Sequence, residues 1–266
     1  MRVQNLLKVE REELISLVST LAFCAFSIRH GRLLLRPLYR AAHHRLHPGL
    51  TPRKSDLLTL GDTPRTCLCR IREALLHNKG LAPFMQEPTW GDNEVHDAEG
   101  WTDANRESDP DLYSGMGGFC PKSGIVWFYK FTSRERELLP IHVTEDLADL
   151  VQLCINAPYL QGRRYLAHVD NEAVNASIAS SHGVHDPRMN EIAILRKHAL
   201  DQNEILMRSE YIESEENVAD PISRGNFSEF VVRANAMGFS EFHWLDIRRE
   251  RIPVDFDQMI AHLMRS

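Results

Sequence analysis

The chain has 266 residues, of which 43% are hydrophobic and 26% charged, a composition typical of a folded protein with a sizeable core. The longest apolar candidate, LISLVSTLAFCAFSI, contains Ser and Thr and ends at Arg29, short of the roughly 18 residues that a membrane span needs. Five scattered cysteines and a start without a cleavage signature favour an intracellular protein, nuclear or cytoplasmic and not secreted.

Charge is unevenly distributed along the chain, whose formal net charge is −6. Residues 1–80 carry 14 Lys and Arg against 6 Asp and Glu, whereas the remainder carries 17 against 31. The basic leading segment could contact phosphates, while the acidic body needs bound divalent cations to approach a polyanion. Alternatively, the basic residues form a solvated face of helices packed on the acidic body.

The first part of the chain has the apolar spacing of a helical hairpin. Apolar positions recur at helical spacing from Glu10 to about His44, with a break at IRHGR, where Gly31 fits a helix C-cap. Pro37 either kinks the second, basic helix or lies in its first turn. Another amphipathic helix, CLCRIREALLHNKG, precedes the polar connector PTWGDNEVHDAEG, where we expect a domain boundary.

From Gly100 the pattern changes to alternating strands and helices. Five segments read as strands: GWTDAN, GMGGFCP, GIVWFYKFT, RRYLAHVDN and EILMRSEYIES. Four segments read as helices, the first with Thr144 as its N-cap: TEDLADLVQLCIN, EAVNASIASSHG, PRMNEIAILRKHALDQN and NVADPISRG. The order β-β-β-α-β-α-α-β-α predicts an α/β fold with a mixed five-stranded sheet and helices on both faces.

Four acidic residues fall at strand or helix ends of this pattern. Asp103 ends the first strand, Glu145 lies in the first turn of the first helix, Asp170 ends the fourth strand and Asp220 lies in the last short helix. A right-handed crossover would make the first and fourth strands neighbours, with Asp103 beside Asp170. Two adjacent carboxylates raise each other's pKa unless a cation intervenes.

Hard oxygen ligands of this kind suit Mg²⁺, which takes its remaining ligands from waters and phosphate oxygens. Two such ions roughly 4 Å apart activate a water on one side of a phosphodiester and stabilise the leaving oxygen on the other. The joint placement of the four carboxylates therefore predicts metal-assisted phosphodiester hydrolysis.

Four segments, WTDAN…GMGG, IHVTEDLADL, YLAHVDNEAVNA and ESEENVADPISRG, together resemble the ribonuclease H domain of retroelement reverse transcriptases. The pattern E-N-x-A-D-x-x-S-R in the last segment is the most distinctive. More narrowly, residues 10–240 resemble the C-terminal part of DIRS-type (tyrosine-recombinase) retrotransposon polyproteins. There, EELISLVSTLAFCAFSIRHGRLLLRPLYRAAH resembles the helical thumb or connection segment that follows the polymerase palm.

This resemblance implies a ribonuclease H-like fold in which Asp103, Glu145, Asp170 and Asp220 match the family's D-E-D-D metal ligands. It implies two Mg²⁺ ions, for which Mn²⁺ can substitute, and endonucleolytic cleavage of the RNA strand of RNA–DNA hybrids, leaving 5′-phosphate and 3′-hydroxyl ends. RNA would be distinguished through 2′-hydroxyl contacts in the shallow minor groove. The implied partners are an RNA–DNA hybrid or other nucleic acid and the polymerase part of a longer polyprotein, with no membrane.

The resemblance also sets the expected domain organisation. The expected parts are a helical thumb- or connection-like segment at 1–60, a linker with one helix at 61–97, the ribonuclease H-like domain at 98–226 and a helical extension at 227–266.

Two features depart from the family. No Tyr-x-Asp-Asp polymerase signature occurs, so the palm is absent and DNA synthesis by this chain alone is not expected. In addition, the polar insert Arg106–Ser114 lengthens the turn before the glycine-rich strand.

Three polar residues are candidate substrate-binding groups, each with a structural alternative. Asn105 either contacts a sugar hydroxyl or forms an Asx turn. Asn171 either hydrogen-bonds the substrate or starts the following helix. Arg224 either reaches a phosphate or, with Ser223, completes the last helix.

The roles of four further residues are left open by the sequence. His182 and His185 are either loop histidines that assist product release or exposed and capping residues. Asp149 shares the helix face of Glu145 and either supports the site or is solvated, and Trp101 is expected to pack under the site. Two other functions also stay open: a catalytically decayed module that binds nucleic acid or another partner, and a structure-selective DNA nuclease of the same superfamily.

Overall fold

The structure, a computed structural model, describes residues 7–25, 31–43, 53–77, 95–109, 111–179, 186–250, 252 and 255–265. The chain divides into two compact units. One contains Met1–Pro88 with Ser181–Gly183, and the other contains Thr89–Ser180 with Val184–Ser266. Within the part of the chain that the structure describes, no helix is both long and apolar enough to cross a membrane.

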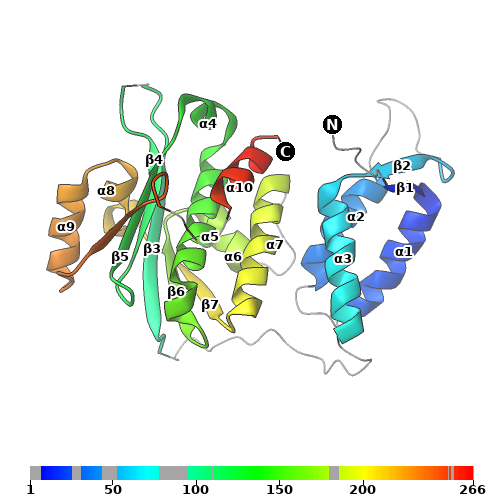
Figure 1. The fold of residues 1–266 in the computed structure, drawn as a ribbon, viewed down its shortest axis with the longest axis horizontal. Helices are drawn as coiled ribbons and strands as arrows, with labels where there is room; N and C mark the ends of the chain where they lie inside the picture. Colours follow the sequence, from blue (N-terminus) through cyan, green and yellow to red (C-terminus); the bar gives the residue numbers. More distant parts are fainter. Residues whose placement is uncertain are drawn as a thin grey trace. The chain divides into compact units, whose positions relative to one another are not determined.

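The first unit is a helical hairpin with a third helix and a small two-stranded sheet (Figure 1). Its elements are β1 (Leu7–Glu10), α1 (Arg11–Cys24), α2 (Gly31–His43), β2 (Leu57–Leu60) and α3 (Asp62–His77). The hairpin of α1 and α2 and the helix α3 confirm the predicted helices. The antiparallel pair β1–β2 was not predicted, because four-residue strands carry little alternation.

Gly31 begins α2, so its prediction as a helix C-cap was wrong. A Cβ atom at this position would lie 2.6 Å from the carbonyl oxygen of Ala25. The glycine therefore permits the close approach of the two helix ends. Pro37 lies inside α2, beyond its first turn.

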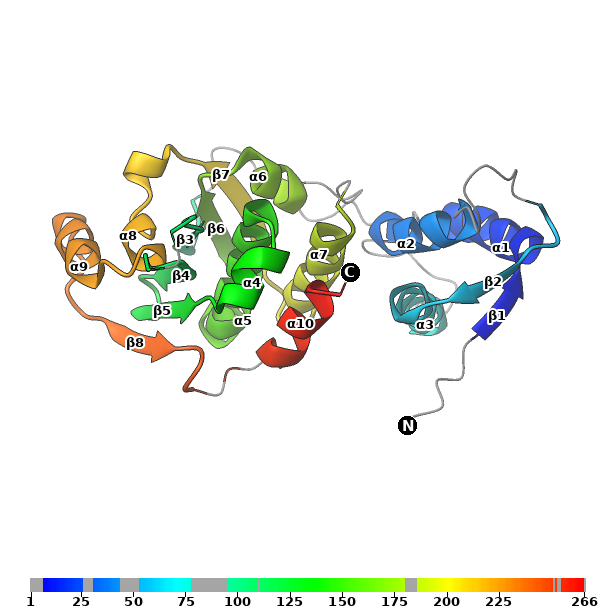
Figure 2. The ribbon, with the colours of Figure 1, turned by 90° about the horizontal axis from the view of Figure 1, so that it is seen from above.

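The second unit is a six-stranded sheet with helices on both faces (Figures 1 and 2). Its strands are β3 (Ala98–Asn105), β4 (Gly115–Cys120), β5 (Ile125–Lys130), β6 (Arg164–Val169), β7 (Leu206–Tyr211) and β8 (His243–Asp246). Its helices are α4 (Ser133–Leu138), α5 (Ile141–Leu160), α6 (Glu172–Ala179), α7 (Pro187–Gln202), η2 (Ser214–Glu216), α8 (Asp220–Ser223), α9 (Phe227–Ala236) and α10 (Phe256–Leu263).

The strand order is β7-β6-β3-β4-β5-β8. Strand β4 runs antiparallel to β3 and β5, whereas β3 with β6, β6 with β7, and β5 with β8 are parallel pairs. The mixed sheet and the placement of helices on both faces confirm the predicted fold class. The predicted count of five strands was wrong, because β8, within the predicted helical extension, pairs with β5.

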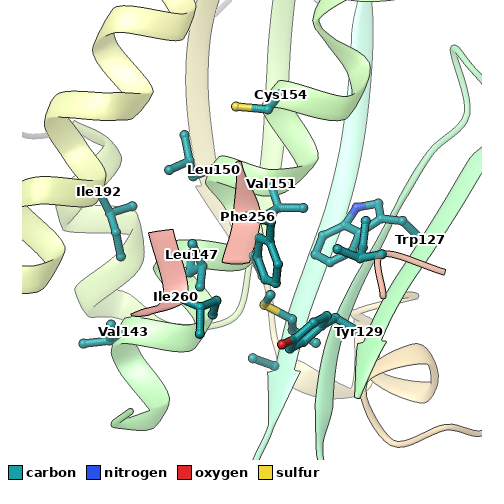
Figure 3. Packing of buried hydrophobic residues seen from close by; sticks show 14 of the residues in the cluster. Trp127, Tyr129, Val143, Leu147, Leu150, Val151, Cys154, Ile192, Phe256 and Ile260 are labelled. Atoms are coloured by element: carbon teal, nitrogen blue, oxygen red, sulfur yellow. The ribbon is translucent and has the colours of Figure 1, made fainter. Parts of the chain in front are cut away.

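Helix α5 lies in the centre of the second unit and is buried on nearly every side. In Figure 3, Leu147 and Val151 of this helix belong to one cluster with Trp127 and Tyr129 of the sheet and Phe256 and Ile260 of α10. The buried residues of α5 include polar as well as apolar side chains. Packing on nearly every side of the helix therefore fixes the positions of most of its side chains.

Helix α5 begins at Ile141, so Thr144 is not its N-cap as predicted. Pro140 occupies the cap position, where a missing N–H costs nothing, and the Thr144 hydroxyl donates to the carbonyl of Ile141 at 2.7 Å. Glu145 consequently lies one turn into the helix, not in its first turn. The short helix α4, which begins with a capping box between Thr132 and Glu135, was not predicted.

The opposite face of the sheet is covered by α8 and α9 through a second apolar cluster (Figure 2). Ile222 of α8 lies so close to β4 that a Cβ atom on Gly117 would be 2.4 Å from its Cγ2 atom and 2.8 Å from the carbonyl oxygen of Trp127. Gly117 pairs with Asp103 across the β3–β4 ladder. The glycine therefore brings α8 to the level of Asp103.

Candidate functional site

Three of the four predicted carboxylates meet beside the centre of the sheet. One oxygen each from Asp103 on β3, Glu145 on α5 and Asp170 after β6 lie within 4.8 Å of one another. In the parallel pair β3–β6, Trp101 is the partner of His168, and the same register continued by two residues brings Asp103 level with Asp170. The predicted neighbourhood of these two aspartates is thus confirmed.

Asp103 is the most buried member of the three, with 6% of its surface exposed. Its Oδ2 atom accepts a hydrogen bond from the hydroxyl of Ser223 on α8. The pKa of Asp103 is raised to about 7, first by burial and then by the charge of Asp170, while the Ser223 hydrogen bond opposes both effects. This carboxyl group is therefore poised between its neutral and ionised forms near neutral pH.

Glu145 is half-buried and accepts a hydrogen bond from the Asn171 amide at Oε2. The pKa of Glu145 is raised to about 8, first by burial and then by the charges of Asp103 and Asp170. The Asn171 side-chain oxygen accepts from the backbone N–H groups of Ala173 at 2.8 Å and Val174 at 3.3 Å. Asn171 thus starts α6 and binds Glu145 at the same time; its contact with substrate stays a prediction.

Asp220 is the first residue of α8 and lies outside the group of three. Its Oδ1 atom accepts from Nε of Arg224 at 2.8 Å, and its charge contributes to the raised pKa of Asp103. The structure therefore leaves Asp220 adjacent to the other carboxylates, held by the arginine one helical turn away.

The two remaining candidates, Asn105 and Arg224, contact the same residue of the polar insert. Nδ2 of Asn105 lies 3.2 Å from Oε1 of Glu107, and Nη1 of Arg224 lies 3.3 Å from the same oxygen. Nδ2 of Asn105 also lies 3.4 Å from the carbonyl oxygen of Tyr113. Both predicted substrate-binding groups are therefore engaged with the insert.

A buried ion cluster behind the site was not predicted. Arg196 of α7 forms ion pairs with Asp146 and, at 2.7 Å, with Asp149 of α5, and all three side chains have at most 1% exposure. Of the two alternatives for Asp149, the solvated position is wrong. A signal was present in the sequence, since Arg196 stands four residues from both Ile192 and Leu200, in the middle of a buried stripe.

Two other sequence hypotheses have different outcomes. Trp101 is buried as predicted and stacks on His168, with ring centroids 4.6 Å apart. His182 and His185 lie outside the described residues.

The hydrogen bond from Ser223 to Asp103 was not predicted from the sequence, although a hydroxyl three residues after Asp220 on one short helix could have indicated it.

Strand order, strand directions and helices on both faces together make the second unit a mixed α/β fold. No protein-family model matches the chain, and no curated protein gave a significant sequence match. Two similar solved structures are ribonuclease H proteins.

One of them is the N-terminal RNase H domain of Rv2228c from Mycobacterium tuberculosis, solved as a fusion with maltose-binding protein. It is 12% identical, with a TM-score of 0.39, over 54% of this chain and 99% of that chain. The other is RNase H1 from the halophilic archaeon Halobacterium salinarum NRC-1. It is 11% identical, with a TM-score of 0.39, over 50% of this chain and 98% of that chain.

Proposed function

We propose that this chain is a ribonuclease H-type endonuclease that hydrolyses the RNA strand of RNA–DNA hybrids. The observation that carries the proposal is the convergence of Asp103, Glu145 and Asp170, from three separate elements, within 4.8 Å. The pKa values of Asp103 and Glu145 are raised first by burial and then by the charges of the neighbouring carboxylates, which repel one another. A bound divalent cation would relieve this repulsion.

The donor set fits Mg²⁺, with Mn²⁺ as a substitute, because all of its groups are carboxylate oxygens. Asp103, Glu145 and Asp170 would hold a first ion, and Asp220, once released from Arg224, would help to hold a second. When bound, such ions activate water and stabilise the leaving oxygen in phosphodiester hydrolysis.

The chain's own polar groups would orient the carboxylates and the substrate. The Ser223 hydroxyl fixes Oδ2 of Asp103, and the Asn171 amide fixes Oε2 of Glu145. Arg224 would offer its guanidinium to a backbone phosphate, and the Asn105 amide would also contact the substrate. Contacts to 2′-hydroxyls in the minor groove would select RNA.

The test is a hybrid-cleavage assay in Mg²⁺ that compares wild type with Asp103→Asn and Asp170→Asn. Each substitution keeps the shape of the side chain and removes an anionic ligand, so we expect cleavage to fall by about 100-fold or more. Asp257→Asn, at an exposed position of α10, is the matched control and should cleave like wild type. Undiminished cleavage by both site variants would sink the proposal.

Two other results would redirect it. If wild type binds hybrids without cleaving them, and Mn²⁺ leaves its thermal stability unchanged, the catalytically decayed binding module is favoured. Cleavage of branched DNA without preference for RNA would indicate a structure-selective DNA nuclease.

We also propose that the chain is part of a DIRS-type retrotransposon reverse transcriptase polyprotein. The four sequence segments quoted above, and ENVADPISR most of all, support this context. Transcript mapping tests it. A polymerase reading frame continuous with this chain would support the proposal, and a mature transcript that encodes this chain alone would contradict it.

A further inference from the structure

Two hydrogen-bond donors from distant parts of the sequence meet on one carboxylate oxygen beside the site. Asn105, at the end of β3, and Arg224, directly after α8, both contact Oε1 of Glu107, at 3.2 and 3.3 Å. Glu107 belongs to neither a helix nor a strand but to the polar insert between β3 and β4. The polar insert thus contributes the carboxylate of Glu107, and the folded core contributes the two donors, Asn105 and Arg224, that bind it.

This donor pair is next to the carboxylate group. Nε of Arg224 holds Asp220 at 2.8 Å, and the charges of Asp220, Asp103 and Glu107 together raise the pKa of Arg224. Asn105 lies two residues beyond Asp103 on the same strand and therefore projects to the same face of the sheet. An anion bound here would lie at the edge of the proposed active site.

The chemistry of the pair is that of a phosphate site. A guanidinium and an amide that converge on one anionic oxygen are the donors that proteins use for nucleic-acid phosphates. The side chains of Arg224 and Glu107 are 51% and 33% exposed, so a ligand can reach both from solvent. The carboxylate of Glu107 occupies the position that a phosphate oxygen would take.

The insert is anchored so that Glu107 faces these donors. The backbone N–H of Glu107 donates to the Ser114 hydroxyl at 2.9 Å, and the guanidinium of Arg106 donates to the carbonyl of Leu139 at 3.2 Å. The loop is therefore held at Glu107 and at the preceding residue, while the Glu107 side chain ends in a weak, solvent-accessible ion pair. Rotation of that side chain would free both donors.

We propose that Asn105 and Arg224 form a binding position for a backbone phosphate of nucleic acid, and that Glu107 occupies this position in the free protein. Glu107 then competes with the nucleic acid and lowers its affinity. This inference rests on the proposed function in taking nucleic acid as the ligand, but it does not require hydrolysis. Because exposed ion pairs are weak, the competition lowers affinity by about two- to fivefold.

The experiment measures binding of a fluorescein-labelled RNA–DNA hybrid by fluorescence anisotropy, with Ca²⁺ in place of Mg²⁺ so that the readout does not depend on hydrolysis. Glu107→Gln should tighten binding by about two- to fivefold. It should also steepen the dependence of log K on log salt by about one counterion. In the variant Arg224 has no ion pair with residue 107, so its pairing with a phosphate releases a counterion and does not merely exchange a carboxylate for a phosphate.

Two comparisons separate this contact from a general charge effect. Asp111→Asn removes the same charge from an exposed position of the same insert and should change affinity much less than Glu107→Gln. In an Arg224→Met background, Glu107→Gln should have no effect, since the donor for which it competes is gone.

Four results would overturn the inference: weaker or unchanged binding by Glu107→Gln, an equal effect of Asp111→Asn, an effect that persists in the Arg224→Met background, or no hybrid binding by any variant. If the expected binding pattern is found and wild type cleaves no hybrid in Mg²⁺, the proposed nuclease function fails and the phosphate position stands.

Discussion

Asp103 is the residue on which the site depends, because it combines deep burial with three sets of neighbours. The Ser223 hydroxyl donates to it, carboxylate oxygens of Asp170 and Glu145 lie within 4.8 Å, and Gly117 faces it across the ladder. Its raised pKa means that the folded chain without a cation opposes ionisation of this carboxyl group. A cation and a proton therefore compete for the same position.

This competition predicts a pH-dependent stability. Asp103 and Glu145 have folded-state pKa values of about 7 and about 8, above the ordinary values of roughly 4. Their stabilising contribution is thus fully present below about pH 4 and is lost as the pH rises through 7 and 8. We expect the melting temperature in EDTA to fall between pH 5 and 8, and Mg²⁺ to raise it more at pH 8 than at pH 5.

Differential scanning fluorimetry of wild type and Asp103→Asn measures this effect, with about 2–4 °C expected per kcal/mol for a unit of this size. The amide cannot ionise, so the fall with pH should be shallower in the variant and its response to Mg²⁺ smaller. Identical pH profiles for the two proteins would contradict the assignment.

At the scale of elements, the contact between α5 and α7 contains the buried cluster of Arg196, Asp146 and Asp149. Burial raises the pKa of both aspartates in spite of the arginine, that of Asp149 to about 6. The hydroxyl of Ser177 on α6 donates to Asp146 at 3.3 Å, so three helices share the cluster. Glu145 is the neighbour of Asp146 in the chain, and the cluster therefore fixes the helix turn from which Glu145 projects.

Arg196→Met should destabilise the protein by about 3–5 kcal/mol, because it leaves two carboxyl groups buried without their cation. The loss should grow with rising pH, as ionisation of those groups becomes more costly. Urea denaturation provides the measurement. Adding Asp146→Asn and Asp149→Asn to the same chain should restore most of the loss; a single-variant loss below about 1 kcal/mol would show that the cluster is not a tightly coupled one.

Secondary structure could be predicted from the sequence where the residues of one element determine its conformation. Contacts between elements distant in the sequence were harder to predict. The strands that carry Asp103 and Asp170 could be predicted from their β-branched and aromatic residues, and the adjacency of these residues follows from parallel pairing. The four-residue strand β8 could not be predicted, because its stability comes from pairing with β5. The contacts of Glu107 with Asn105 and Arg224 depend on the path of an irregular loop, which no periodic pattern encodes.

At the scale of the whole molecule, the two compact units differ in charge. Residues 1–88 carry 14 Lys and Arg against 7 Asp and Glu, and residues 89–266 carry 17 against 30. All the carboxylates of the candidate site belong to the second unit. The basic unit therefore contributes no ligand to that group, and its charge is available for long-range attraction of a polyanion.

Deletion of residues 1–88 should weaken hybrid binding at low salt and leave it nearly unchanged at about 1 M salt, where the screening length falls to roughly 3 Å. Anisotropy titrations of both chains over a range of salt concentrations test this expectation. A thermal shift of the shortened chain in Mn²⁺ is the control that its site is intact. Equal affinity at low salt would favour the alternative that the basic residues form a solvated face.

Strand β8 has a consequence for how this fold avoids self-association. It covers the outer edge of β5, whose sequence IVWFYK combines high β-propensity with strong hydrophobicity. A chain that ended at residue 226 would retain every carboxylate of the site but would leave this edge open to pair with another molecule. By covering the edge of β5, the segment after α9 protects the sheet from pairing with another molecule. We expect natural or engineered removal of this segment to lower the solubility of the chain first.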